Sequence, residues 1–174
     1  MGDRTVYVDN NTNDYFQIAT VGLVLASTEK RAYQILQMWD TDYVLIFQSS
    51  MFSFGADDIN KFLWMVRICN GYYPEVEEVD YLNDNGIYRV GNEASKRFRE
   101  SLMYKMVYYN LPSQNGEIFD RTRKTPVTIS DIDLRYLEEA YTTSNYLVRI
   151  YRVKKETDRG FVEELDMQRA SLST

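Results

Sequence analysis

Two helices are predicted near the start of the chain from the spacing of its apolar residues. The first runs from about Tyr15 to Leu25, follows a polar turn over residues 9–14 that can cap it, and is weakened by Gly22. The second begins after a cap at Ser27 or Thr28. Its buried face is expected to be the i, i+3, i+4, i+7 set Ala32, Ile35, Leu36 and Trp39.

Three more helices are predicted further along the chain. The stretch DDINKFLWMVRI, residues 57–68, places a core face on one side of a helix. Another helix follows a cap at Ser95, and a short one is expected from Leu134 to Tyr141. The expected buried faces of the first two are Ile59, Phe62, Leu63 and Val66, and Phe98, Leu102 and Met106.

Strands are predicted in three places. Residues 5–9, TVYVD, and residues 145–155, NYLVRIYRVKK, are rich in β-branched and aromatic residues. The continuous apolar run from Tyr43 to Phe47 is typical of a strand that is covered on both faces, as in a parallel sheet. Asn83 to Gly86 has the composition of a hairpin turn.

The remaining segments favour one folded unit. Residues 111–133 hold two of the three prolines and few large apolar residues, so a mobile loop is expected there. Residues 4–155 are expected to form a single helix-rich α/β or α+β domain around a small, partly parallel sheet. Residues 1–3 are interpreted as an added start, and residues 156–174 as a charged tail that frays.

Composition excludes several kinds of chemistry. The net charge of −6 offers no basic field for phosphates, which argues against a nucleic-acid partner. The chain has no histidine and one cysteine, so zinc sites, a histidine base and Ser-His or Cys-His pairs are excluded within it. Cys69 lies in a helical apolar pattern and is interpreted as a small core residue. The fifteen tyrosines need hydrogen-bond partners wherever they are buried.

Two motifs are interpreted on the residues alone. The turns after the expected first and second strands lack the glycines that cradle phosphate, which argues against a nucleotide site. Asn10-Asn11-Thr12 is an N-x-Thr glycosylation acceptor, although the same residues are ordinary helix-cap chemistry.

The helix at residues 57–68 has a second, narrower face. Relative to Asp58, Lys61 lies about 60° to one side and Met65 about 20° to the same side, which aligns an acid, a base and a soft apolar side chain. A purely structural explanation makes Asp57 the N-cap and Asp58–Lys61 a surface pair worth about 0.2–0.5 kcal/mol. That explanation leaves the neighbouring methionine without a role.

This stretch resembles the DK motif, Asp-x-x-Lys with a methionine after three more residues, of the eukaryotic oligosaccharyltransferase catalytic subunit. The resemblance covers roughly residues 4–155 and includes the stretches VDNNT, ASTEKRAYQIL, DYVLIF, SLMYKM and EEAYTTSNYLVRIY. It implies that the chain is the lumenal C-terminal domain of an endoplasmic reticulum membrane protein. It also implies glycosylation at Asn10 in the lumen.

The resemblance further implies a division of labour in the intact enzyme. The enzyme transfers a dolichol-linked oligosaccharide to the asparagine of Asn-x-Ser/Thr sequons with a divalent metal, Mn²⁺ or Mg²⁺. The metal ligands, the donor site and the Trp-Trp-Asp acceptor motif lie outside the matched region, so no catalytic, cofactor or metal residue is expected in this chain. The isolated chain is expected to be inactive, and other subunits of the complex are expected as partners.

The role that the resemblance implies for this chain is acceptor recognition. The position of Met65 would touch the threonine methyl, while Asp58 and Lys61 would shape and polarise the acceptor Ser/Thr pocket. Burial of one methyl is worth about 0.8 kcal/mol, or roughly a fourfold preference for threonine. The alternative is a non-catalytic lumenal module that docks other subunits or nascent chains.

The chain departs from the family in two loops. Asn13 to Gln17 replace a tryptophan, a second acceptor triplet and a histidine, and Gln48-Ser49 replace a glycine pair. These departures put the shape of both loops in question and leave Asp58, Lys61 and Met65 unchanged.

Overall fold

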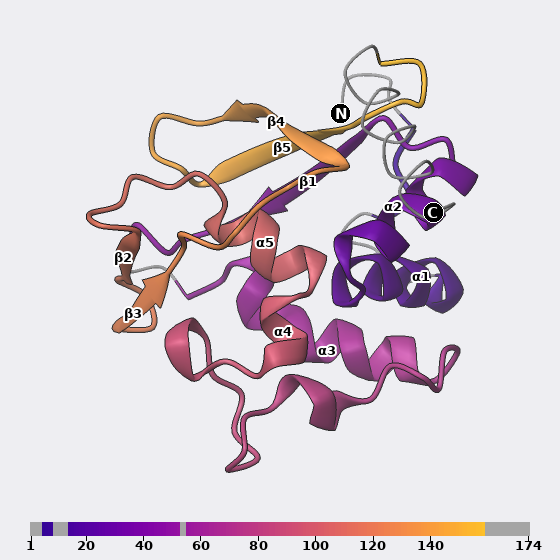
Figure 1. Ribbon diagram of the computed structural model, residues 1–174. Helices are drawn as coiled ribbons and strands as arrows, with labels where there is room; N and C mark the ends of the chain where they lie inside the picture. Colours follow the sequence, from indigo (N-terminus) through magenta and orange to yellow (C-terminus); the bar gives the residue numbers. More distant parts are fainter. Residues whose placement is uncertain (1–4, 9–13, 53–54, 159–174) are drawn as a thin grey trace, which may run out of the picture.

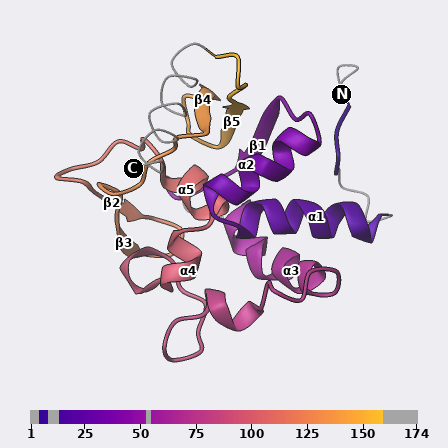
Figure 2. The ribbon, with the colours of Figure 1, turned by 45° about the vertical axis from the view of Figure 1, so that its right-hand side comes forward.

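The computed structural model describes residues 5–8, 14–52 and 55–158. A group of helices packs against one face of a three-stranded sheet, and a two-stranded hairpin lies at the side (Figures 1 and 2). In chain order the elements are α1 (Tyr15–Ala26), α2 (Glu29–Met38), β1 (Tyr43–Phe47), α3 (Asp58–Asn70), short 3-10 helices at Glu78–Tyr81 and Gly91–Glu93, α4 (Lys96–Arg99), α5 (Leu102–Tyr108), β2 (Glu117–Asp120), β3 (Thr125–Thr128), β4 (Leu137–Thr142) and β5 (Val148–Val153).

Both described sheets are antiparallel. The larger sheet has the order β1-β5-β4, and the smaller one pairs β2 with β3. The helix-rich α+β class is therefore confirmed, but the expectation of a partly parallel sheet is wrong. The prediction of a parallel strand from the run Tyr43 to Phe47 failed because the apolar residues of this run are not all buried. Ile46 faces the core, whereas Tyr43, Leu45 and Phe47 are about half exposed on the other face.

The first three helices lie where periodicity predicts them. The Asp14 carboxylate caps α1 by accepting a hydrogen bond from the Gln17 amide at 3.0 Å. Gly22 has a packing role, because a Cβ built on it would lie 2.8 Å from the Met65 carbonyl oxygen of α3. The glycine that weakens α1 as an isolated helix therefore allows α1 and α3 to approach closely.

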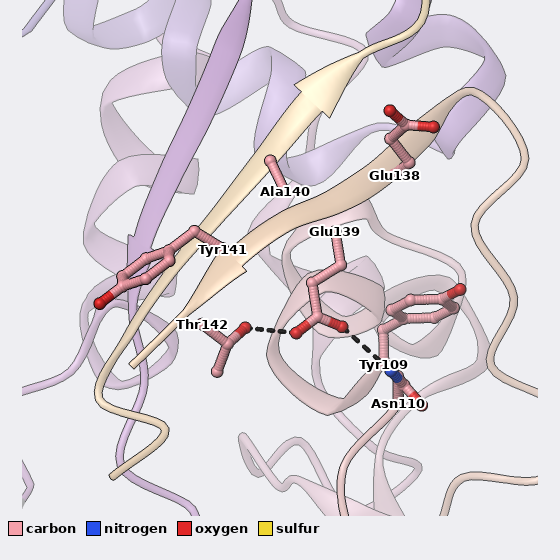
Figure 3. Close-up of a pocket in the computed structure, with 7 residues that line it drawn as sticks. All are labelled: Tyr109, Asn110, Glu138, Glu139, Ala140, Tyr141 and Thr142. Atoms are coloured by element: carbon pink, nitrogen blue, oxygen red, sulfur yellow. Dashed lines mark hydrogen bonds between the residues drawn. The ribbon is translucent and has the colours of Figure 1, made fainter. Parts of the chain in front are cut away.

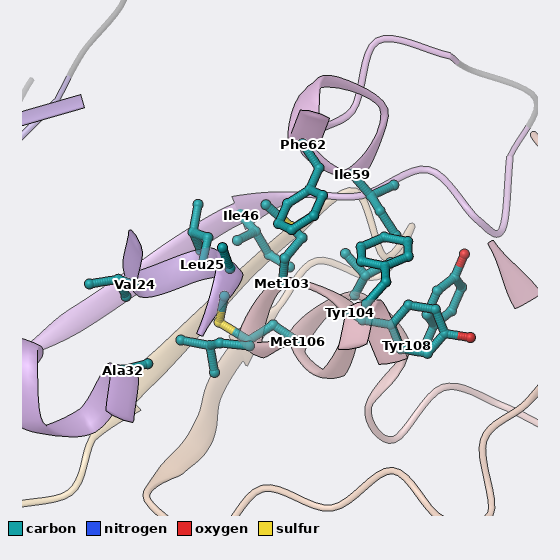
Figure 4. Packing of buried hydrophobic residues seen from close by; sticks show 14 of the residues in the cluster. Val24, Leu25, Ala32, Ile46, Ile59, Phe62, Met103, Tyr104, Met106 and Tyr108 are labelled. Atoms are coloured by element: carbon teal, nitrogen blue, oxygen red, sulfur yellow. The ribbon is translucent and has the colours of Figure 1, made fainter. Parts of the chain in front are cut away.

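Aromatic and aliphatic side chains from helices and sheet form one core (Figure 4). Phe62 of α3 stacks on Phe98 with ring centroids 4.9 Å apart, and Tyr104 meets Phe98 edge-on. Cys69 is fully buried in this core, and burial raises the pKa of its thiol to about 12, which confirms its interpretation as a core residue.

Two fully buried tyrosines of this core donate hydrogen bonds to main-chain carbonyls. Tyr81 donates to the Ala26 carbonyl at 2.9 Å, and Tyr151 donates to the Met106 carbonyl at 2.6 Å. Each hydroxyl lies near the end of a helix, where carbonyl groups lack partners within the helix.

Arg149 joins the sheet to α5. Its side chain is completely buried and donates to the carbonyls of Met106 at 3.0 Å and Tyr109 at 2.7 Å, at the C-terminal end of that helix. Its guanidinium also pairs with Glu139 of β4 at 3.1 Å. A buried cation therefore satisfies free helix carbonyls while it holds two strands over α5.

The expected short helix at residues 134–141 is wrong, because β4 occupies Leu137–Thr142. The carboxylate of Glu29 accepts hydrogen bonds from the amides of Arg135, Tyr136 and Leu137 at 2.7–3.1 Å. These contacts with α2 hold the backbone extended as it enters the sheet beside β5.

The expected loop at residues 111–133 instead contains the β2–β3 hairpin. Ile118 and Val127 face inward and are buried, whereas Phe119 is 57% exposed. The alternation in each strand is only four residues long, which is too short to outweigh the prolines and polar residues around it.

The expected helix after Ser95 is divided into α4 and α5. Ser101 caps α5 by accepting from the Tyr104 amide at 3.2 Å, and its hydroxyl donates back to the Phe98 carbonyl at 2.6 Å. The Leu102 amide bonds to the Ser27 carbonyl at 2.8 Å, so the end of α1 fixes this break.

The expectations for the turn at residues 83–86 and for the two ends of the chain have mixed outcomes. Residues 5–8 do not form a strand, and Asp9 lies outside the described residues. The ring of Tyr7 stacks on that of Trp39, with the ring centroids 4.5 Å apart. Asn83 to Gly86 does form a turn, but no strands flank it. The strand near the end of the chain is confirmed as β5, while residues 1–3 and most of the expected tail lie outside the described residues.

Gly22→Ala is predicted to destabilise the chain by about 1–3 kcal/mol, because overpacking against the α3 backbone outweighs the roughly 1 kcal/mol gain in helix propensity. Gly55→Ala is the matched control, since a Cβ there meets nothing within 4 Å. Urea unfolding monitored by circular dichroism gives both values. A Gly22→Ala variant as stable as the parent would contradict the close approach of α1 and α3.

Candidate functional site

The N-terminus of α3 is built around a buried carboxylate. Asp57 precedes the helix as its N-cap residue, as predicted, but its side chain does not bond to the amides of the helix. One carboxylate oxygen accepts from the Ser49 amide at 3.0 Å and the Ser49 hydroxyl at 2.7 Å, and the other oxygen pairs with Arg123. Asp57 therefore ties α3 to the turn after β1 and to the hairpin.

Arg123 lies between two fully buried carboxylates. It pairs with Asp57 and, at 3.3 Å, with Asp120, which also accepts from the Tyr108 hydroxyl at 2.7 Å. Burial acts to lower the pKa of Arg123, but the hydrogen bond and charge of Asp57 outweigh it, so the pKa is raised. Burial, reinforced by the charge of Asp120, raises the pKa of Tyr108 well above its ordinary value.

The turn that carries the Gln48-Ser49 departure is tightly bonded. Gln48, Ser49 and Ser50 are fully buried, and the Gln48 side-chain oxygen accepts from the Ser50 amide at 2.8 Å and the Ser50 hydroxyl at 2.6 Å. The hairpin adds a bond from the Arg121 amide to the Ser50 carbonyl at 2.8 Å. Polar side chains thus build this turn.

The side of α3 that carries the DK motif, here called the DK side, has three residues that differ in exposure: Asp58, Lys61 and Met65. Asp58 and Met65 are half-buried at the border of the core, whereas Lys61 is exposed. The Asp58 carboxylate accepts from the Phe47 amide of β1 at 2.7 Å, and no salt bridge joins Asp58 to Lys61. Burial raises the pKa of Asp58, against the opposing effects of the Phe47 amide and of the Lys61 charge.

Sequence reasoning did not identify three residues near this helix. Arg123 and Asp120 support Asp57 from a segment that was expected to be a loop, and Trp64 is 49% exposed three residues after Lys61. A signal existed for Asp120, because aspartate is a common turn residue and here follows a short alternating run.

An open hollow lies beside β4 (Figure 3). Its wall includes Glu139, which accepts hydrogen bonds from Asn110 at 3.1 Å and from Thr142. The same carboxylate is engaged by Arg149, so its polar atoms serve the fold. No residue of α3 lines this hollow.

The described residues contain no group of three or more acidic, cysteine or histidine side chains that could hold a metal ion. Among the described helices, none has the length and apolar character needed to cross a membrane.

Comparison with known proteins identifies relatives along almost the whole chain. The chain is 48% identical over 165 residues to dolichyl-diphosphooligosaccharide–protein glycosyltransferase subunit STT3B of Oryza sativa. It is 45% identical over 164 residues to subunit STT3 of Saccharomyces cerevisiae and 44% identical over 165 residues to STT3 of Dictyostelium discoideum. Each match covers 92% of this chain.

This chain is homologous to the STT3 subunits. The resemblance inferred from the DK motif is thereby confirmed. The chain spans about 23% of the length of these STT3 relatives, so they are much longer proteins. No family model matches the chain. Asn10 lies outside the described residues, and the roles of Asp58, Lys61 and Met65 stay predictions.

Arg123→Met is predicted to cost about 3–5 kcal/mol of unfolding free energy, because it leaves the buried carboxylates of Asp57 and Asp120 without a cation. Arg121→Met is the matched control. Arg121 is exposed in the same hairpin, so its loss should change stability by less than about 0.5 kcal/mol. Equal free energies of unfolding for the two variants in urea would show that Arg123 does not stabilise the start of α3.

Proposed function

We propose that this chain is the lumenal acceptor-recognition domain of an oligosaccharyltransferase catalytic subunit. The enzyme would transfer a dolichol-linked oligosaccharide to the asparagine of Asn-x-Ser/Thr sequons. The observation that carries the proposal is the DK side of α3 in a chain homologous to STT3. On this side the exposed Lys61 lies beside the half-buried Asp58 and Met65, and the Arg123–Asp57 ion pair holds the N-terminus of the helix in place.

The proposed chemistry of this side of α3 is binding. Lys61 has no salt bridge within the described part of the chain, so its ammonium group remains available to polarise a hydroxyl group. Met65 packs partly against the core and presents an adaptable apolar surface that suits a methyl group. Asp58 is anchored to β1 through the Phe47 amide and would fix one wall of the pocket.

The bond-making parts are proposed to lie elsewhere in the longer protein. The divalent metal, Mn²⁺ or Mg²⁺, and the dolichol-linked donor would be bound by its membrane part, and other subunits would accompany it in the endoplasmic reticulum membrane.

A second candidate function is a non-catalytic lumenal module that docks other proteins. The observation that favours it is the outer face of the larger sheet, where Tyr43, Leu45, Phe47 and Tyr141 are each 47–58% exposed. Apolar sheet faces of this kind occur at protein interfaces. The kinetic experiment below separates the two candidates.

Met65→Ala in the intact enzyme is predicted to lower kcat/KM for Asn-x-Thr peptides more than for Asn-x-Ser peptides. The substitution removes the contact with the threonine methyl, so the roughly fourfold preference for threonine over serine should narrow. Lys61→Ala should weaken both peptides, because its charge acts on whichever hydroxyl is bound. The measurement is steady-state kinetics with paired Thr and Ser peptides.

Two controls make this test specific. Arg67→Ala shortens an exposed residue on the opposite side of α3 and should leave the Thr/Ser ratio unchanged. The 174-residue chain alone should show no transfer, and measurable transfer by it would overturn the division of roles. If Met65→Ala and Lys61→Ala both leave the kinetics unchanged, the docking module becomes the better assignment.

We also propose that Asn10 is glycosylated when the chain is made in the secretory pathway, since a lumenal location exposes its Asn-Asn-Thr sequence to the modifying enzyme. The secreted product should move faster on a gel after glycosidase treatment, and Asn10→Gln should abolish that shift. A parent protein whose mobility does not change would count against a modified Asn10 and weaken the lumenal assignment.

A further inference from the structure

The outer edge of β1 exposes main-chain groups in a regular pattern. The Asp42 carbonyl accepts from the Val153 amide at 2.9 Å, and the Gln48 amide donates to the Leu147 carbonyl at 2.9 Å. With the antiparallel register of β1 and β5, these bonds show that the even-numbered residues pair with β5. Tyr43, Leu45 and Phe47 therefore direct their amides and carbonyls away from the sheet.

One of these outward amides is already bonded. The Phe47 amide donates to the Asp58 carboxylate at 2.7 Å, which joins the end of the strand edge to the start of α3. Within the described residues, the outward amides and carbonyls of Tyr43 and Leu45 have no hydrogen-bond partner. The free part of the edge thus leads directly to the DK side of α3.

The two edges of this sheet differ in how they are protected. β4 has a register shift between Glu139 and Tyr141, a feature that disrupts pairing with a further strand. β1 has a continuous register, no proline and no charged side chain. Its residues Tyr43, Leu45 and Phe47 are 58%, 50% and 47% exposed. An unprotected apolar edge of this kind is suited to cover by another extended chain.

We propose that β1 binds an extended segment of the acceptor polypeptide as an added strand, beside the sequon held at α3. This inference rests on the proposed function and extends it from the hydroxyl residue to the flanking chain. The names of the STT3 relatives make protein the acceptor. Main-chain bonds suit such a substrate, because they hold any extended sequence without selecting its side chains.

The geometry specifies which acceptor amides matter. Tyr43 and Leu45 are two residues apart, so each can exchange a pair of main-chain bonds with one of two acceptor residues that are also two apart. The acceptor residue between them turns its amide toward solvent. Loss of one of these bonds should raise KM by about two- to tenfold, which is the usual effect of one exposed hydrogen bond.

The first experiment uses the intact wild-type enzyme and Asn-x-Thr peptides with long flanks, N-methylated at one flanking amide at a time. KM should rise about two- to tenfold at two positions that are two residues apart on one flank, with little change between them and in kcat. Equal effects at consecutive positions, or none at any, would overturn the added strand. This experiment does not depend on the folding of any variant.

The second experiment changes the strand. Leu45→Pro removes an amide that does not bond to β5, so the sheet keeps its pairing, and edge strands accept proline at such positions. It should raise KM for the long peptide but not for a blocked Asn-x-Thr tripeptide. Leu45→Ala retains the amide and should raise KM for the long peptide by less. Equal effects of Leu45→Pro on the two peptides would reject the proposal.

Lys61→Ala in the same assays separates failure of this inference from failure of the proposed function. If Lys61→Ala weakens binding of both peptides while Leu45→Pro and N-methylation have no selective effect, acceptor recognition by α3 is supported and the added strand is rejected.

Native mass measurement of the Leu45→Pro enzyme tests whether β1 is instead covered by another subunit or by a second copy of the chain. Loss of a subunit or of a second copy would show that one of these covers β1 and would overturn the assignment to the acceptor.

Discussion

The salt bridge between Arg123 and the buried carboxylate of Asp57 is the contact on which the candidate site depends. It brings the start of α3, the turn after β1 and the β2–β3 hairpin to one point, although its partners are 66 residues apart in sequence. Two buried carboxylates near each other would repel without a cation between them. The guanidinium compensates both charges, and the orientation of the DK side of α3 follows from this arrangement.

Charged side chains also join irregular backbone at two other places. Glu29 collects three amides at the entry to β4, and Arg149 collects carbonyls at the end of α5. In each case a charged side chain bonds to main-chain groups that no helix or strand satisfies. Apolar burial drives the packing of the regular elements, and these charged residues determine how the irregular segments join them.

Periodicity was sufficient for the elements whose pattern is long or strongly apolar. Helices α1, α2 and α3 and strands β1 and β5 lie close to their predicted places, and the alignment of Asp58, Lys61 and Met65 on α3 follows from helix geometry alone. It failed where distant contacts decide the conformation. Glu29 imposes an extended backbone on residues 135–137, and the capping hydroxyl of Ser101 begins a new helix. Likewise, no local pattern could reveal that Arg123 supports Asp57.

The burial of Cys69 has a practical consequence for work on this surface. It is the only cysteine in the chain, it is inaccessible, and its thiol remains protonated at neutral pH. A cysteine introduced on the exposed side of α3 or along β1 would therefore be the one readily reactive thiol of the folded chain. Spin labels, fluorophores or photocrosslinkers could be placed there without removing the native cysteine.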